Sequence, residues 1–326
     1  MTRSALFLST CFVSIGALLS HLGDGPRMLG WALIGFPLAA GTMLGAWLWA
    51  WRDDDTDFLL RIRVGLVGGL LGTIGYDLFR IPFDIAGANT LAPIRVYGLW
   101  TTGSSGSTLW TDLAGFSYHL SNGVTFAWIY AIVMLRRHWA WAIGWGLLLE
   151  TLAVLSPFGE VFAIRKATYG LVLAYLGHVW YGLPLGLLCQ DPERLRRWRV
   201  FGVRAWGAGA LGNACVCAWF VLFQYAGVRA APPSAITIGP ESIRPTWRDA
   251  SITESLLLTN PTASELEVLV RTPTIGGHTI HRYSIAAQAQ HDLALDFPGI
   301  YQIQVFDRPW RSVFIAVHDQ GRYRRR

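Results

Sequence analysis

The first 229 residues consist of long apolar runs separated by short polar stretches. A membrane-spanning helix needs about 20 mostly apolar residues, because the hydrocarbon core of a bilayer is about 30 Å thick. Seven runs reach or approach that length, at residues 5–22, 28–51, 64–81, 113–135, 139–158, 167–189 and 205–227. The pattern therefore predicts a multi-pass α-helical membrane bundle of seven helices over residues 1–229.

The pattern changes after the stretch APPSA, which follows the last apolar run. Short segments rich in β-branched and aromatic residues alternate there with Asn-Pro, Thr-Pro, Gly-Gly and Pro-Gly turns. They are SITESLLLTN, ELEVLVRT, TIHRYSIAA, HDLALDF, IYQIQVF and SVFIAV. Regular short strands between turn signals are typical of a β-sandwich. Residues 230–326 are therefore predicted to form an all-β sandwich, as in immunoglobulin-like domains, outside the membrane.

The composition strengthens the membrane interpretation. Hydrophobic residues make up 52% of the chain and charged residues only 15%, against about 25% in a typical soluble domain. The 16 tryptophans agree, because Trp is enriched at membrane–water interfaces. The net charge of +6 is spread over short loops, without a long basic patch with interleaved aromatics. We therefore expect the lipid bilayer as a partner and no nucleic acid.

Arginines in the short loops predict the orientation, because cytoplasmic loops carry an excess of Lys and Arg. They follow the second, fourth and sixth apolar runs: Arg52, Arg61, Arg63, Arg136, Arg137, Arg194, Arg196, Arg197, Arg199 and Arg204. This spacing predicts an integral inner (plasma) membrane protein with a cytoplasmic N-terminus and a periplasmic, extracytoplasmic β-domain. The segment 82–111 would be a long outer loop. The first run is expected to be a retained helix, with a signal peptide as the alternative.

The C-terminal region resembles the cupredoxins. The resemblance rests on ITIGPESIRPTW, LLLTNPTASELEVLV and HDLALDFPGIYQIQVFDRPWRSVFIAV, which contain an Asn-bearing strand end and a Pro-Gly-x-Tyr corner. It implies a sandwich, but the family's copper ligands are missing. No Cys follows Tyr301, and Ser264 and Glu265 stand where a His would follow the Asn-Pro turn. Without a thiolate we expect no blue-copper site, and a sandwich that serves for contact.

Polar residues inside the apolar runs are the main functional signal, because an ionisable group costs about 2.5–3.5 kcal/mol at the centre of a membrane helix. They are Asp77, Arg80, Asp112, His119, Asn122, Glu150 and His178. We expect His119 and Asn122 to share a helix face, with Asp112 above them. Interhelical hydrogen bonding explains the set most simply. A metal bound by His119, His178 and Asp77, a haem between the two histidines, and a proton relay remain alternatives.

Glycines in the third run point to packing rather than catalysis. Gly65 and Gly69, like Gly68 and Gly72, are four residues apart and allow close approach between helices. No catalytic motif is evident, so we expect a non-enzymatic scaffold or accessory subunit of a larger membrane protein complex, of respiratory or photosynthetic type. The alternative is a metal- or haem-binding membrane enzyme or metal handler. A transporter is a weaker third possibility.

Overall fold

The computed structural model describes most of the chain as a helical region followed by a β-region. The described residues are 2–22, 27–86, 90–104, 106–156, 158–159, 162, 168–197, 205–230, 235–240, 243–244, 247–251, 254–272, 279–307 and 312–318. Arg199 and Arg204 of the third basic stretch lie outside them. The N-terminal part is helical with several apolar helices, and the C-terminal part forms mixed β-sheets.

The helical region contains a helix within or around each of the seven predicted runs. Its elements are α1 (Arg3–Cys11), α2 (Val13–Leu22), α3 (Met28–Gly30), the π-helical turn η1 (Trp31–Gly35), α4 (Phe36–Arg52), α5 (Thr56–Ile85), α6 (Ala92–Thr102), α7 (Leu109–Met134), α8 (Ala140–Leu155), α10 (Thr168–Gln190), α11 (Arg194–Arg197) and α12 (Ala205–Ala230).

Four stretches of the described chain are long and apolar enough to cross a membrane: Arg3–Leu22, Met28–Arg52, Thr56–Ile85 and Gly170–Gln190. Ala140–Leu155 and Gly207–Leu222 are apolar but shorter. Helix α7 is long but is not among these four stretches, and it contains the polar residues Asp112, His119 and Asn122. Length and hydropathy therefore support four of the seven predicted spans. The other three rest on the pattern of apolar residues alone.

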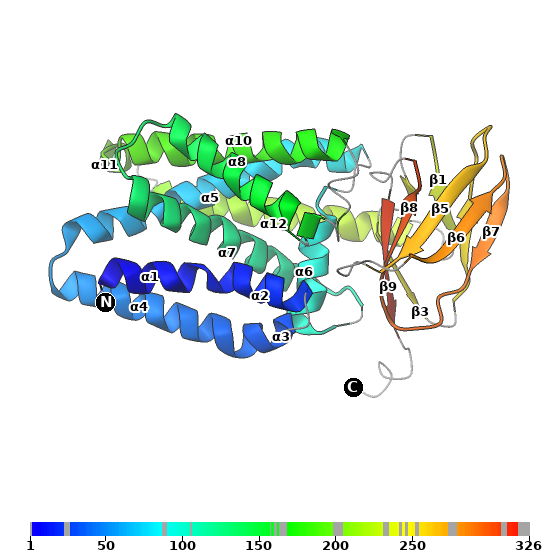
Figure 1. The fold of residues 1–326 in the computed structure, drawn as a ribbon, viewed down its shortest axis with the longest axis horizontal. Coiled ribbons are helices and arrows are strands. Elements are labelled where there is room, and N and C mark those ends of the chain that lie inside the picture. Colours follow the sequence, from blue (N-terminus) through cyan, green and yellow to red (C-terminus); the bar gives the residue numbers. More distant parts are fainter. Residues whose placement is uncertain are drawn as a thin grey trace.

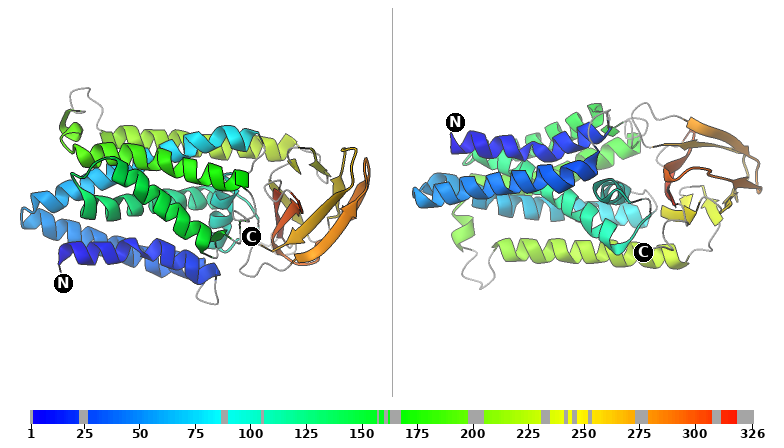
Figure 2. Two further views of the ribbon diagram at one scale, coloured as in Figure 1. Left: turned by 45° about the horizontal axis from the view of Figure 1, so that its top comes forward. Right: turned by 90° about the horizontal axis from the view of Figure 1, so that it is seen from below.

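The long helices run side by side with the β-region at one end (Figures 1 and 2). The N-terminus, the α4–α5 and α7–α8 connections and α11 lie at the opposite end. Arg52, Arg61 and Arg136 belong to these connections or to the helix ends beside them. The described basic stretches therefore share one end of the molecule, away from the β-region.

Helix α5 lies against α7, α10 and α12. A Cβ on Gly65 or Gly69 would meet the backbone of α7, at Trp128 or Val124. A Cβ on Gly68 or Gly72 would meet α10, at Leu185 or Tyr181. Two glycine faces on one helix thus allow two neighbouring helices to approach closely.

The prediction of a loop over residues 82–111 is wrong. Helix α5 continues through Pro82 to Ile85, and α6 occupies residues 92–102. Pro93 lies in the first turn of α6, where its missing N–H costs nothing, and Gly103 ends the helix at φ 66°. The Gly and Thr content suggested a loop, but Gly98 serves close packing: a Cβ there would lie 1.9 Å from the Thr111 carbonyl oxygen of α7.

The β-region consists of two sheets around one core. The strands are β1 (Ala235–Ile238), β2 (Ile243–Arg244), β3 (Trp247–Ser251), β4 (Leu256–Thr259), β5 (Leu266–Arg271), β6 (Thr279–Ile285), β7 (Gln290–Leu293), β8 (Gly299–Val305) and β9 (Ser312–His318). The sheet orders are β2-β1-β4-β7 and β3-β9-β8-β5-β6. Pairs β1–β4 and β3–β9 are parallel, and the other pairs are antiparallel. Buried Ile236 and Leu258 of one sheet pack with Val268 and Ile303 of the other.

Two polar side chains fix the turns of the β-region. Asn260 is fully buried, donates to the carbonyl oxygens of Ser264, Ile285 and Ala286, and accepts from the Thr262 N–H. The Tyr301 hydroxyl donates to the Phe297 carbonyl oxygen across the Pro-Gly-x-Tyr corner at 2.7 Å. The asparagine and tyrosine of the cupredoxin-like pattern therefore have structural roles here.

A buried ion pair lies where the two regions meet. Arg95 of α6 is 3% exposed, and its Nε lies 3.3 Å from Asp112 Oδ1 of α7. Its guanidinium also faces the rings of Phe220 and Trp247, at 5.7 Å and 5.4 Å. Cation–π contacts of this kind strengthen when the cation is desolvated. Arg95 thus joins α6, α7, α12 and strand β3.

A hydrogen bond completes the junction between the regions. The Ser107 N–H donates to Asp249 Oδ1 of β3 at 3.0 Å. Burial raises the pKa of the Asp249 carboxyl, while this hydrogen bond and the Arg95 charge act in the opposite direction. Buried Trp247 and Phe314 of the five-stranded sheet pack against Val96 and Leu99 of α6. The sheet therefore rests on α6 through both apolar and polar contacts.

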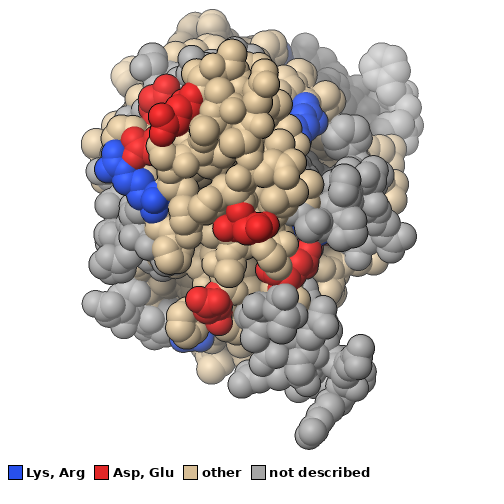
Figure 3. Space-filling view, turned by 90° about the vertical axis from the view of Figure 1, so that its right-hand side faces the viewer, with Lys and Arg blue, Asp and Glu red and all other residues tan. Residues whose placement is uncertain are grey.

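The two ends of the molecule differ in charge. Figure 3 shows the end formed by the β-region, where Asp and Glu side chains lie in several places and few basic ones are visible among the described residues. The helix connections at the other end carry arginines together with Asp53, Asp55 and Asp57, which pair with Arg3 and Arg61. Charge is therefore distributed along the long axis, although the whole chain is basic.

Replacing Gly98 by alanine should destabilise the protein by about 1–3 kcal/mol, because the new Cβ would overlap the Thr111 carbonyl oxygen. Thermal unfolding followed by far-UV circular dichroism measures the loss. The matched control is Gly144→Ala in α8, where a Cβ meets nothing within 4 Å. That variant should be neutral or slightly more stable, because alanine is the better helix former. Equal stabilities of the two variants would contradict the α6–α7 packing.

Candidate functional site

A cavity of about 400 Å³ lies inside the helical region. Small-molecule sites typically measure about 300–1,000 Å³. Its walls come from α2, α5, α6, α7, α8 and α10 and from the segment after α8. The lining residues are Ile15, Leu18, Leu19, Thr73, Tyr76, Tyr97, Tyr118, His119, Asn122, Gly123, Phe126, Leu149, Glu150, Leu152, Ala153, Ser156, Phe158, His178 and Tyr181. The lining is apolar overall, with a few polar groups.

One polar group of the site centres on Asp77 of α5. Its carboxylate is fully buried and lies 3.0 Å and 3.1 Å from the His119 Nε2 of α7. Arg80 Nη1 lies 3.6 Å from Asp77 Oδ1 and shares the face of α5 at i+3. The Arg80 guanidinium also faces the Tyr76 ring at 4.6 Å. Asp77 is therefore held by two cationic or hydrogen-bonding partners.

A second group pairs α8 with α10. His178 Nδ1 lies 3.1 Å from Glu150 Oε2 and 2.9 Å from the Ala174 carbonyl oxygen. Glu150 is 4% exposed, and its Oε1 has no hydrogen-bond partner among the described residues. The Tyr76 ring contacts both histidines, at centroid distances of 6.0 Å from His119 and 4.9 Å from His178. The two groups thus meet around Tyr76.

The structure divides the predicted polar residues into two places. Asp77, His119, Glu150 and His178 come together, and Asn122 also lines the cavity. Asp112 lies apart from them, because Arg95 of α6 is its partner. Arg95 was missed by sequence reasoning, since it stands in a segment assigned to a loop. The apolar residues around it, Ile94, Val96 and Leu99, were the available signal.

The positions of His119 and His178 bear on whether the two histidines could bind one metal ion. Among the described residues, no group of three or more His, Cys, Asp or Glu side chains is placed to hold a metal ion. His119 contacts Asp77, whereas His178 contacts Glu150. The two histidines thus belong to separate hydrogen-bonded pairs, which is an arrangement that orients imidazole rings.

Tyrosines tie the cavity walls together. The Tyr118 hydroxyl of α7 donates to the Ser14 carbonyl oxygen of α2 at 2.7 Å. The Tyr181 hydroxyl of α10 donates to the Gly123 carbonyl oxygen of α7 at 2.6 Å. These bonds hold α2 and α10 to opposite sides of α7. They also occupy hydroxyl protons that would otherwise point into the cavity.

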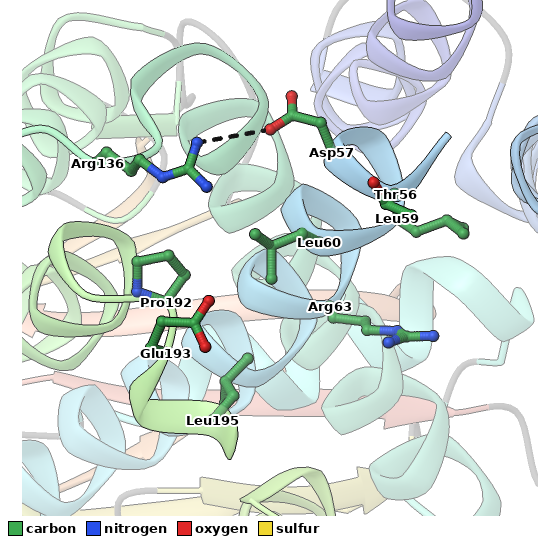
Figure 4. A pocket seen from close by; sticks show the side chains of 9 residues that line it. All are labelled: Thr56, Asp57, Leu59, Leu60, Arg63, Arg136, Pro192, Glu193 and Leu195. Atoms are coloured by element: carbon green, nitrogen blue, oxygen red, sulfur yellow. Dashed lines mark ion pairs between the residues drawn. The ribbon is translucent and has the colours of Figure 1, made fainter. Parts of the chain in front are cut away.

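A second cavity, of about 510 Å³, lies at the basic end beside the start of α5 (Figure 4). The Asp57 carboxylate and the Arg136 guanidinium point toward each other across it, 3.8 Å apart. Their side chains are 53% and 62% exposed, so this ion pair is worth at most about 1 kcal/mol. The first cavity is the candidate site, because the buried Glu150 and the two histidines His119 and His178 line it.

Comparisons with known proteins identify similarity to cupredoxins over part of the chain. A purple cupredoxin from Nitrosopumilus maritimus is 11% identical, with a TM-score of 0.24, over 26% of this chain and 99% of that one. An amicyanin variant in its reduced Cu(I) form is 11% identical, with a TM-score of 0.23, over 27% of this chain and 85% of that one. No protein-family model and no curated protein matches the chain.

Replacing Asp77 by asparagine should cost about 3–5 kcal/mol of stability, because it leaves the Arg80 guanidinium buried without its counter-charge. The double variant Asp77→Asn, Arg80→Met should recover much of that loss, since both charges are then absent. Thermal unfolding of the two variants and of Arg80→Met alone completes a double-mutant cycle. Additive effects would mean that the two residues do not interact.

Proposed function

We propose that the chain is an integral membrane protein with seven spans, a cytoplasmic basic end and an extracytoplasmic β-region. The arrangement that supports this is the gathering of the described basic stretches at the end away from the β-region. That distribution agrees with the excess of Lys and Arg in cytoplasmic loops. We further propose that the β-region is a cupredoxin-like sandwich that serves for contact, in which Asn260 and Tyr301 fix the turns.

We propose that the helical region binds a small amphipathic molecule from the bilayer. The cavity between α2 and α8 carries this proposal, because it combines apolar walls with a polar end. Leu19 of α2 and Leu152 of α8 line the cavity and are 42% and 52% exposed, so it reaches the flank of the bundle. A molecule dissolved in the membrane could enter there without crossing water.

The second candidate is an accessory subunit of a larger membrane complex. Helix α4 favours it, because only 11% of an 18-residue apolar stretch within Met28–Arg52 is buried by this chain. Leu38 and Trp51 on this helix are 66% and 65% exposed. Membrane lipid or another helical subunit would cover this face. The binding and scaffold functions are compatible, since the cavity lies away from α4.

Filling the cavity should abolish ligand binding. A fatty alcohol with a photoactivatable diazirine in its tail should label peptides of α2 or α8 in wild-type protein reconstituted in lipid nanodiscs. Ala153→Trp places an indole in the cavity and should reduce this labelling to background, as measured by mass spectrometry.

Leu38→Trp is the matched control, because it adds the same ring on the exposed face of α4 and should leave cavity labelling unchanged. Labelling confined to lipid-facing residues such as Leu38, and unaffected by Ala153→Trp, would refute the cavity as a binding site.

The scaffold function predicts a specific partner on α4. Purification from the native membrane in a mild detergent should yield stoichiometric helical subunits, and cross-linkers placed at residue 38 should capture one of them. The same cross-linker at Leu176 of α10, also exposed, is the control position. A monodisperse chain without cross-linked subunits would exclude the accessory role.

A further inference from the structure

The polar end of the cavity offers hydrogen-bond acceptors that the described residues do not satisfy. Glu150 Oε1 and Asn122 Oδ1 are buried atoms without a hydrogen-bond partner in the described part of the chain. Both residues line the cavity. A buried polar atom left unpaired costs about 1–3 kcal/mol, so a bound molecule that supplies donors would regain this energy.

The histidines contribute acceptors as well. His119 Nε2 faces both oxygens of Asp77, which only accept when ionised, so this nitrogen carries the proton. His178 Nδ1 faces Glu150 Oε2 and the Ala174 carbonyl oxygen, so it too is a donor. In each neutral ring the other nitrogen is then an acceptor. Both rings line the cavity.

Three hydroxyl donors in the lining are already engaged. The hydroxyls of Tyr118 and Tyr181 donate to backbone carbonyl oxygens of Ser14 and Gly123. The Thr73 hydroxyl donates to the Gly69 carbonyl oxygen within α5. The unpaired oxygens of Glu150 and Asn122 therefore favour a ligand that brings its own O–H or N–H groups.

The apolar part of the lining indicates how a ligand would be oriented in the cavity. Ile15, Leu18 and Leu19 of α2 line the cavity together with Leu149 and Leu152 of α8, and Leu19 and Leu152 are also exposed on the outside of the bundle. An alkyl chain that enters from the bilayer finds an equally apolar surface there, so packing contacts hold it in the cavity. The tail thus lies toward the bilayer and the head toward Glu150 of α8 and Asn122 of α7.

We propose that the cavity binds an aliphatic amphiphile whose head donates hydrogen bonds, as an alcohol or an amine does, to Glu150 and Asn122. This inference rests on the proposed binding function and specifies its ligand. An ammonium head would in addition pair with the Glu150 carboxylate, since buried charges need a partner. A head that only accepts, such as an ether or a fatty-acid carboxylate, would leave Glu150 Oε1 unpaired.

The test is competition against the diazirine fatty alcohol in nanodiscs. Dodecanol or dodecylamine should displace the probe at concentrations where methyl dodecyl ether and dodecanoate do not. A comparison of dodecanol with dodecylamine distinguishes two kinds of interaction with the head group. A preference for the amine indicates charge pairing, and equal potency indicates hydrogen bonding alone. The ether and the alcohol share their tail, so the difference between them reports the donor.

Glu150→Met should weaken dodecanol binding about tenfold or more, because a hydrogen bond to a charged group is worth about 1.5–3 kcal/mol. Asn122→Leu provides a second variant if Glu150→Met does not fold. An ether that competes as well as dodecanol, or variants that bind dodecanol like wild type, would overturn the donor-head inference while cavity labelling persists. Loss of cavity labelling in wild-type protein would instead overturn the binding function itself.

Discussion

The close approach of α7 and α10 to α5 is the constraint on which the candidate site depends. Without side chains at Gly65, Gly69, Gly68 and Gly72, the backbones of both neighbours lie against one helix. This proximity brings His119 from α7 within reach of Asp77 on α5. Helix α10 likewise carries His178 to the Tyr76 ring of α5 and, through its contact with α8, to Glu150. Larger residues on α5 would separate the helices and leave these groups buried without partners.

The polar residues then resolve a conflict between burial and charge. An apolar bundle can hold Asp77 and Arg80 only if they neutralise each other, and their i,i+3 spacing on one helix achieves this locally. The histidines act differently, because each accepts or donates according to its neighbour. Asp77 and Glu150 fix which ring nitrogen carries the proton, and the remaining nitrogens face a space large enough for a small molecule. A structural hydrogen-bond network and a binding surface are thus the same set of atoms.

Much of the fold could be predicted from the sequence, because apolar runs and alternating strands leave period and length signals. The segment 82–111 could not, since α6 is short and its Gly98 looks like a loop residue until α7 is placed beside it. The pairing of residues from different helices could not be predicted either. The sequence places Asp112 on the same helix face as His119, but in the structure Asp112 pairs with Arg95. The depth of His119 and His178 indicated a polar site, whereas their separation into two carboxylate pairs depends on how α8 and α10 pack. The spans, the orientation and the accessory role stay predictions.

The junction at Arg95 has a consequence for the order in which the chain can assemble. Arg95 and Asp112 are made early in synthesis, whereas Trp247, which covers the guanidinium, follows about a hundred and fifty residues later. Until the last third of the chain leaves the ribosome, the helical region must therefore hold an incomplete surface at α6, with a charge pair exposed to water. The pair is well suited to that interval, because water solvates it while the sheet is absent. Docking of the sheet then places Trp247 over the guanidinium and completes its burial.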